Sequence, residues 1–198
     1  MQNHLIIFVK NPVLGTVKTR LAKSIGDEAA LAVYKDLMQK CRRESLIVEA
    51  KRHLFYSKQI IDKDDWSDSN FDKKLQAEGD LGVKISEAFK EVFQSEEKVI
   101  VIGSDCYDLT SNIIEEAFQK LDEVDLVLGP ANDGGYYLLG TKVFYPSLFD
   151  GISWSTETVL NETLDQASKL DLSVAILEEL VDLDTLEDLK RSGYQLKK

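Results

Sequence analysis

The chain has 198 residues, of which 43% are hydrophobic and 30% charged, and its formal net charge is −11 at pH 7. This length fits a single domain, residues 1–198, and the ordinary composition indicates a folded protein rather than a disordered one. The negative charge argues against a broad surface for nucleic acid or anionic membranes, because such surfaces are rich in Lys and Arg. A local cluster of cations could still hold a small phosphate ligand.

The cysteines and the first apolar run predict the cellular compartment of the protein. Cys41 and Cys106 are far apart in the sequence and have no neighbouring Cys or His that would suggest a zinc site, a disulfide framework or a nucleophile. The apolar run Leu5–Val9 is shorter than a signal-peptide core or a membrane span. We therefore expect a reduced, cytoplasmic protein without a membrane span.

Short apolar runs alternate with amphipathic segments along the chain. Strands are predicted at residues 5–9, 53–56, 98–103, 125–130, 136–141 and 172–177, and helices at residues 27–45, 85–93, 113–121 and 156–169. This alternation predicts an α/β fold with a mixed, mainly parallel sheet and helices on both faces. The strand at 136–141 follows its predecessor so closely that it should pair antiparallel or form an edge.

Two segments outside these elements carry more specific expectations. Residues 62–72 are acidic and rich in turn formers, so they are predicted to form a surface loop. A last helix should begin near residue 185, with Asp184 as its N-cap and Glu187 completing a capping box.

The stretch KNPVLGTVKTRL, residues 10–21, follows the first predicted strand and concentrates positive charge. Lys10, Lys18 and Arg20 surround Gly15 and Thr16, a combination that offers backbone N–H groups and cations to phosphoryl oxygens. The loop matches neither the Walker pattern nor the dinucleotide-binding pattern. Solvated surface cations are the alternative interpretation, and on either reading the loop is expected to be exposed without ligand.

Two more loops follow predicted strands and should meet the basic loop at the carboxyl edge of the sheet, where ligands of open α/β folds bind. In VIGSDCYDL, Ser104 precedes Asp105, whose carboxylate could hold a divalent cation such as Mg²⁺ or could act only as a turn former or cap. In GPANDGGYYLLG, Asp133 would face a ligand, while Gly134 and Gly135 let the backbone approach it closely. A hairpin turn accounts for the same three residues.

Two late segments add polar groups to this edge. Ser155 and Thr156 follow Trp154 at a predicted helix N-terminus, where hydroxyl and free N–H groups suit an acceptor or a phosphate. An ordinary N-cap beside a buried Trp154 is the alternative. After the last strand, Asp184 is assigned to the helix cap, which leaves Asp182 as a possible second metal ligand.

The motifs in their order resemble a known set. They are K-x-P-x-x-G-x-x-K-T-R-L, Q-x-x-G-D-L-G, G-S-D-C-x-x-L, D-G-G-Y-Y-L-x-G, W-S-T and D-x-D-T-x-E-D-L, running from Lys10 to Leu189. Together they are similar to the uncharacterised bacterial glycosyltransferase-like proteins of the nucleotide-diphospho-sugar transferase superfamily. The sequence departs from the expected pattern at Tyr107, where proline is expected, and at Lys84, where arginine is expected.

The resemblance implies a single-domain, Rossmann-like GT-A fold, a three-layer sandwich, together with a nucleotide donor and Mg²⁺ or Mn²⁺. It assigns the metal to Asp105 and to the late D-x-D-T element, with Asp182 as the second ligand. Donor-binding residues would be Lys10, Gly15, Thr16, Lys18, Arg20, Gly79, Gly82, Ser104, Gly134, Gly135, Ser155 and Thr156. Lys18, Arg20 and Asp133 would be catalytic.

The reaction stays open between alternatives. The superfamily resemblance favours transfer from an NDP-sugar, but the K-T-R-L loop also resembles that of the guanylyltransferases that act on 2-phospholactate with an NTP. Either reaction needs cations that stabilise charge on a diphosphate or pyrophosphate leaving group. A non-catalytic nucleotide-binding protein is the third alternative, and the acceptor cannot be named from the sequence.

Overall fold

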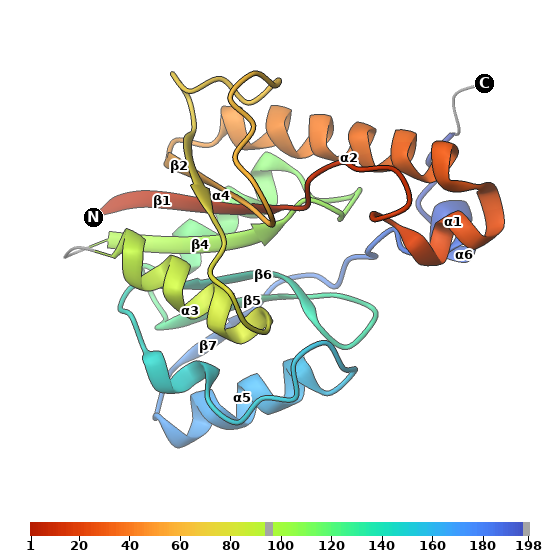
Figure 1. The fold of residues 1–198 in the computed structure, drawn as a ribbon. Coiled ribbons are helices and arrows are strands. Elements are labelled where there is room, and N and C mark those ends of the chain that lie inside the picture. Colours follow the sequence, from red (N-terminus) through yellow and green to blue (C-terminus); the bar gives the residue numbers. More distant parts are fainter. Residues whose placement is uncertain (94–96, 196–198) are drawn as a thin grey trace.

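A computed structural model describes residues 1–93 and 97–195 and contains a seven-stranded sheet (Figure 1). The strand order is β3-β2-β1-β4-β6-β5-β7, and β6 runs antiparallel to both of its neighbours while the other pairs are parallel. The strands are β1 (Gln2–Val9), β2 (Lys51–Tyr56), β3 (Asp72–Leu75), β4 (Glu97–Gly103), β5 (Leu126–Pro130), β6 (Tyr136–Thr141) and β7 (Val174–Ile176). The predicted mixed, mainly parallel sheet is confirmed.

Helices cover both faces of the sheet (Figure 1). They are α1 (Thr19–Ile25), α2 (Asp27–Ile47), α3 (Leu81–Val92), α4 (Ser111–Lys120), α5 (Val159–Lys169) and α6 (Leu186–Arg191), with a 3₁₀ turn η1 at Pro146–Phe149. One face packs against α2 and α4, and the opposite face against α3, α5 and η1. The three-layer α/β sandwich is therefore confirmed.

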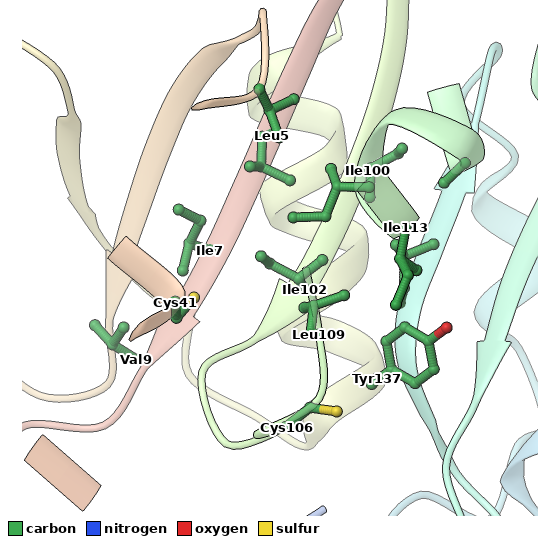
Figure 2. Close-up of a cluster of buried hydrophobic side chains, with 14 of the residues drawn as sticks. Leu5, Ile7, Val9, Cys41, Ile100, Ile102, Cys106, Leu109, Ile113 and Tyr137 are labelled. Atoms are coloured by element: carbon green, nitrogen blue, oxygen red, sulfur yellow. The ribbon is translucent and has the colours of Figure 1, made fainter. Parts of the chain in front are cut away.

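The central strands are apolar on both sides because both faces are covered. In β1, Leu5 and Ile7 point to the α2/α4 face, where Figure 2 shows them close to Ile100 and Ile102 of β4, and Ile6 points to the opposite face. All five side chains are at most 1% exposed. These two strands anchor the loops that follow them.

Strand β6 lies inside the sheet and not at its edge. Val99–Ile102 of β4 face Leu138–Thr141 on one side, and β5 pairs with β6 on the other. Of the two alternatives for residues 136–141, antiparallel pairing is confirmed and the edge position is wrong. The antiparallel direction brings the first residue of β6, Tyr136, to the edge where β4 ends.

Three local expectations are corrected. Residues 62–72 form a loop, but Trp66 and Phe71 are buried and anchor it, and it leads into the unpredicted short strand β3. The N-cap of α6 is Thr185, with Asp188 at N3 of the capping box, so the assignment to Asp184 and Glu187 is one residue early. Asp184 is instead drawn to a lysine, as described below. Helix α1 begins inside the basic loop.

Two buried histidines and an aspartate link the neighbouring strands β1, β2 and β3. His4 Nδ1 lies 3.0 Å from His53 Nε2, and the rings stack with centroids 5.2 Å apart. His53 Nδ1 lies 3.3 Å from an oxygen of Asp72 on β3. Burial lowers the pKa of His53 to about 4, so the pair is neutral at neutral pH and serves the core.

No helix among residues 1–93 and 97–195 has the combination of length and apolar composition that crossing a membrane requires.

Candidate active site

A cavity of about 540 Å³ opens where the parallel strands end. Lys10, Ser57, Gln76 and Asp105 follow β1, β2, β3 and β4, and all four line the cavity. The strand order places these four chain segments side by side, as expected for a ligand crevice at the carboxyl edge of an open α/β sheet. The predicted meeting of the basic loop and the Asp105 loop is thus explained by topology.

Tyr34 of α2 holds the ends of β1 and β4 together. Its hydroxyl accepts a hydrogen bond from the backbone N–H of Lys10 at 2.7 Å and lies 3.0 Å from the Lys10 carbonyl oxygen. The Ser104 hydroxyl lies 3.3 Å from the same Tyr34 oxygen. Because Tyr34 is 1% exposed, the two loops are fixed to each other through a buried side chain.

The basic loop is a compact turn. The Asn11 side chain accepts a hydrogen bond from the Lys58 N–H at 2.9 Å, which ties the start of the loop to the segment after β2. The N–H of Thr16 and its hydroxyl both donate to the Val13 carbonyl, at 3.1 and 2.9 Å. Gly15 has φ +73°, a conformation that suits glycine in such a turn. The Thr16 hydroxyl is therefore used to shape the loop.

Lys18 contradicts the expected exposure of the loop. Its side chain is 2% exposed, and its ammonium lies 3.1 Å from Asp105 Oδ2 and 2.8 Å from Asp184 Oδ1. Lys18 has a left-handed backbone conformation, φ +49°, as the N-cap of α1, which turns the chain so that the side chain points inward. Burial works to lower the pKa of Lys18, but the two carboxylates outweigh it and raise the pKa, so the group is charged.

Arg20 has a different environment. It lies one residue inside α1, its side chain is 67% exposed, and its guanidinium is 3.8 Å from Asp184 Oδ2. The expectation of an exposed basic loop is therefore right for Arg20 and wrong for Lys18. The difference arises because α1 begins between them.

Asp182 and Asp105 are neighbouring carboxylates on the cavity wall. Cys106 pairs with Asp182 in an antiparallel bridge, and the N–H of Leu183 donates to the Asp105 carbonyl at 3.3 Å. Burial and the charge of Asp105 raise the pKa of Asp182 to about 7. Burial also acts to raise the pKa of Asp105, but the Lys18 ammonium outweighs it and keeps this pKa low. The charges of Asp105, Asp133 and Asp184 raise the pKa of Asp182 and the charge of Lys18 lowers it, so negative charge is in excess around Asp182.

Cys106 packs and does not react. The residue is 8% exposed and belongs to the α2/α4 core cluster, and Figure 2 shows it in the loop that follows β4. Burial raises the pKa of the thiol to about 12, which disfavours the thiolate that a nucleophile requires. Cys106 is therefore a packing residue of the α2/α4 core cluster.

Asp133, Gly134 and Gly135 form a turn that is held against the start of α5. Asp133 Oδ1 accepts the Gly135 N–H at 3.0 Å, and the Gly134 carbonyl accepts the Leu160 N–H at 2.9 Å. A Cβ atom at Gly134 would lie 2.1 Å from the Glu157 carbonyl oxygen, and φ there is +86°. This close approach gives Gly134 a packing role toward residues 153–158.

The same segment is locked from its other side by Gly82 of α3. A Cβ atom at Gly82 would lie 2.1 Å from the Trp154 indole nitrogen, so only glycine leaves room for the ring. Between the two locks Ser155 has φ +66°, a strained conformation for a residue with a side chain, and lines the cavity. The Thr156 hydroxyl donates to the Ser153 carbonyl at 2.7 Å and shapes the segment.

The cavity brings together part of the predicted set. Its wall includes Lys10, Gly79, Ser104, Asp105, Ser155 and Asp182. The wall does not include Gly15, Thr16, Lys18, Arg20, Gly82, Asp133, Gly134, Gly135 or Thr156. Lys18 and Arg20 adjoin it through their ion pairs with Asp105 and Asp184. The ligand roles of the remaining residues stay predictions.

Sequence reasoning did not assign Gln76, Ser57 or Tyr34 to the site. Gln76 is part of the quoted Q-x-x-G-D-L-G pattern, and its side-chain amide donates to the carbonyls of Val9 and Phe55, at 3.3 and 3.0 Å. This bridges the ends of β1 and β2. Tyr34 and Ser57 carry no signal of their own, because only the assembled sheet edge shows their position.

The carboxylates suit a hard divalent cation that is shared with a substrate. Mg²⁺ is usually held by one or two carboxylates, substrate phosphates and water, and Asp105 and Asp182 supply two carboxylates on one wall. Within the described part of the chain, no three His, Cys, Asp or Glu side chains gather as a self-sufficient metal centre. The residues therefore fit a cation that arrives with a phosphate ligand.

Several solved structures share this architecture. A Desulfovibrio desulfuricans G20 protein, provisionally named a nucleotide-diphospho-sugar transferase, is 30% identical, with TM-score 0.87 over 96% of this chain and 85% of its own. The inositol-1-phosphate CTP transferase from T. maritima is 14% identical, with TM-score 0.58 over 96% of this chain and 94% of its own. The 4-diphosphocytidyl-2C-methyl-D-erythritol synthase from Anaerococcus prevotii DSM 20548 is 12% identical, with TM-score 0.60 and 96% coverage of both chains. The chain thus has the Rossmann-like fold shared by nucleotide-diphospho-sugar transferases and nucleotidyltransferases.

Residues 38–156 match the family described as "Uncharacterized protein conserved in bacteria (DUF2064)". This match spans more than half of the chain. The chain therefore belongs to that family. No curated protein matches the sequence.

Proposed function

We propose that this chain is a transferase that uses a nucleotide-activated donor, an NTP or an NDP-sugar, together with Mg²⁺ or Mn²⁺. The observation that carries the proposal is the meeting of the basic loop with Asp105 and Asp182 at one cavity on the carboxyl edge of the sheet. Cations there would neutralise the donor's phosphates, and the carboxylates would hold the divalent cation between protein and phosphates. The name of the D. desulfuricans relative is consistent with this class of donor.

Two reactions use such a site. In glycosyl transfer, an acceptor oxygen bonds to the anomeric carbon, the bond from that carbon to the diphosphate oxygen breaks, and a nucleoside diphosphate leaves. In nucleotidyl transfer, the acceptor oxygen bonds to the α-phosphorus, the bond to the bridging oxygen breaks, and pyrophosphate leaves. A hydroxyl acceptor also loses a proton, and Asp133, whose charge acts on Asp182, is the proposed proton acceptor.

Lys18 would change its ion-pair partners when a donor binds. In the ligand-free chain its ammonium compensates Asp105 and Asp184. A divalent cation, when bound, would supply positive charge at Asp105 and at the phosphate oxygens. Lys18 would then be available to the leaving diphosphate, and Arg20 would reach the same group from the exposed side of α1.

Product analysis tests the proposal. Common NTPs and NDP-sugars are incubated with the protein, Mg²⁺ and a panel of hydroxyl and phosphate acceptors, and released pyrophosphate and nucleoside diphosphate are measured separately. Release of nucleoside diphosphate identifies glycosyl transfer, and release of pyrophosphate identifies nucleotidyl transfer. Tight nucleotide binding without release from any acceptor would favour the non-catalytic alternative.

The metal is tested by calorimetry on Asp105→Asn. We expect wild-type nucleotide affinity to rise on addition of Mg²⁺, and the variant to lose most of this increase because one of two carboxylates is gone. Asp108→Asn is the matched control, since Asp108 is an exposed carboxylate of the same loop that does not line the cavity. An equal Mg²⁺ effect in Asp105→Asn and wild type would refute the metal assignment.

A further inference from the structure

We infer that the acceptor carries an anionic group, a phosphate, phosphonate or carboxylate, and that Lys84 and Ser155 hold it on the α3 side of the cavity. This inference rests on the proposed function and adds the chemical class of the second substrate. It follows from where the cations of the site lie relative to the sheet.

The cations around the cavity fall into two groups on opposite faces of the sheet. Lys10, Lys18 and Arg20 belong to the loop and helix that lead into α2, which packs on one face. Lys84 belongs to α3, which packs on the other (Figure 1). Asp105 and Asp182 lie between the two groups, where the cavity crosses the sheet edge. One donor diphosphate held at the basic loop leaves Lys84 unused.

In-line transfer places the acceptor and the leaving group on opposite sides of the reacting centre. In phosphoryl transfer the attacking and leaving oxygens lie roughly in line, on opposite sides of the phosphorus. With the leaving diphosphate against Lys18 and Arg20, the acceptor must enter from the α3 side. Lys84 lies on this side of the cavity.

The ammonium of Lys84 has no hydrogen bond or ion pair with the residues that the structure describes. The nearby Asp80, whose Oδ1 accepts the Val83 N–H as the N-cap of α3, makes no ion pair with Lys84. By contrast, the buried lysines Lys18, Lys73 and Lys98 each pair with a carboxylate. A half-buried, unpaired ammonium on a cavity wall of an acidic protein is available to an anionic ligand.

Ser155 provides the second polar group on this side, and it would serve the acceptor and not the donor, to which the sequence resemblance assigns it. The hydroxyls of its neighbours Thr156 and Thr158 are hydrogen-bonded within the segment, whereas that of Ser155 has no partner among the described residues. The contact of Trp154 with Gly82 fixes the segment against the first turn of α3, and Lys84 follows Gly82 by two positions in that turn. Leu81, Ile85, Tyr136 and Leu138 add apolar surface to this wall, and Asp80, the N-cap of α3, also lines it. An ammonium and a hydroxyl in such a wall suit a small acceptor with one anionic end.

The test is a titration followed by amide NMR. Protein saturated with GTP or UDP-glucose at fixed Mg²⁺, so that the donor subsite is filled, is titrated with inorganic phosphate and, separately, with acetate. We expect saturable shifts at Gly82–Ile85 and Ser155. Lys84→Ala should weaken phosphate binding at least about tenfold and leave nucleotide affinity unchanged, because one charge-assisted contact is lost. Ser155→Gly should weaken it less and keep the fold, since glycine tolerates this backbone conformation.

The control is Lys90→Ala, which removes an exposed cation from the last turn of the same helix and should bind phosphate as wild type does. Absence of phosphate and acetate binding, or equal affinity in Lys84→Ala and wild type, would overturn the inference. A loss of nucleotide affinity in Lys84→Ala would also overturn it, since Lys84 would then serve the donor. Failure of both nucleotides to bind would refute the proposed function alone, because phosphate binding at Lys84 can still be read in the ligand-free chain.

Discussion

Lys18 and Arg20 are two cations of one loop, two positions apart, and the fold gives them opposite environments. Lys18 is 2% exposed and makes two ion pairs within 3.1 Å, whereas Arg20 is 67% exposed and reaches only one carboxylate at 3.8 Å. A buried pair is costly to break from one side, while an exposed pair contributes little to stability. Lys18 therefore supports the ligand-free structure, and Arg20 is free to serve a ligand.

The comparison predicts its largest effect for Lys18→Ala. The change leaves Asp105 and Asp184 without their shared cation, so we expect the free energy of unfolding to fall by about 2 to 3 kcal/mol, somewhat below the range for fully buried pairs because both carboxylates are partly exposed. Urea denaturation measures this. Lys18→Gly should be about 1 kcal/mol more stable than Lys18→Ala, since φ is +49°. A Lys18→Ala variant as stable as wild type would break the comparison.

The difference in free energy of unfolding between wild type and Lys18→Ala should depend on pH. The lowered pKa of Asp105 means that its stabilising contribution is present above the unfolded-state pKa near 3.8 and is lost as the pH falls below it. The raised pKa of Lys18 means that its contribution is present below about 10.5 and is lost as the pH rises through the higher folded-state value. Wild type and Lys18→Ala should therefore differ most in stability between about pH 4 and 10.5, and the difference should shrink as the pH falls through the lowered folded-state pKa of Asp105 or rises through the raised folded-state pKa of Lys18. Denaturation series at pH 2, 3, 5 and 7 check this, and a difference at pH 2 as large as that at pH 7 would contradict the ion-pair account.

A smaller effect, on binding and not on stability, is expected for Arg20→Ala. Its free energy of unfolding should stay within about 0.5 kcal/mol of wild type, because the side chain is exposed. Affinity for GTP or UDP-glucose should fall about tenfold, the cost of one charge-assisted hydrogen bond to phosphate. Isothermal calorimetry measures the affinity. Lys23→Ala, which removes an exposed cation of the same helix, should bind nucleotide unchanged.

The smallest expected effect belongs to Arg20→Lys. The charge is kept and only the planar two-pronged donor is lost, so affinity should lie between wild type and Arg20→Ala. Equal nucleotide affinity across wild type, Arg20→Lys and Arg20→Ala would show that Arg20 is a solvated surface cation.

The sequence predicts the framework of the site better than its electrostatics. Apolar runs identify β1 and β4, and the rule that ligands bind at the carboxyl edge then brings Lys10 and Asp105 together. The burial of Lys18 escapes such reasoning, because it depends on a short helix that starts inside the loop and on Asp184, which is far away in the sequence. Strand β3 was missed for a related reason: its sequence, Asp-Lys-Lys-Leu, has no apolar pattern and is held by pairing with β2.

Gly82 and Gly134 show how a motif glycine can serve packing beside a cavity that it does not line. Each leaves room for one side of residues 153–158, the Trp154 ring on one and the Glu157 carbonyl on the other. The two glycines lie on either side of residues 153–158, and the absence of a side chain at each leaves the space that this segment occupies. Mutational scanning should therefore find both glycines intolerant of substitution, and related sequences should conserve them. The reason would be the space that Ser155 and its neighbours need at these two positions.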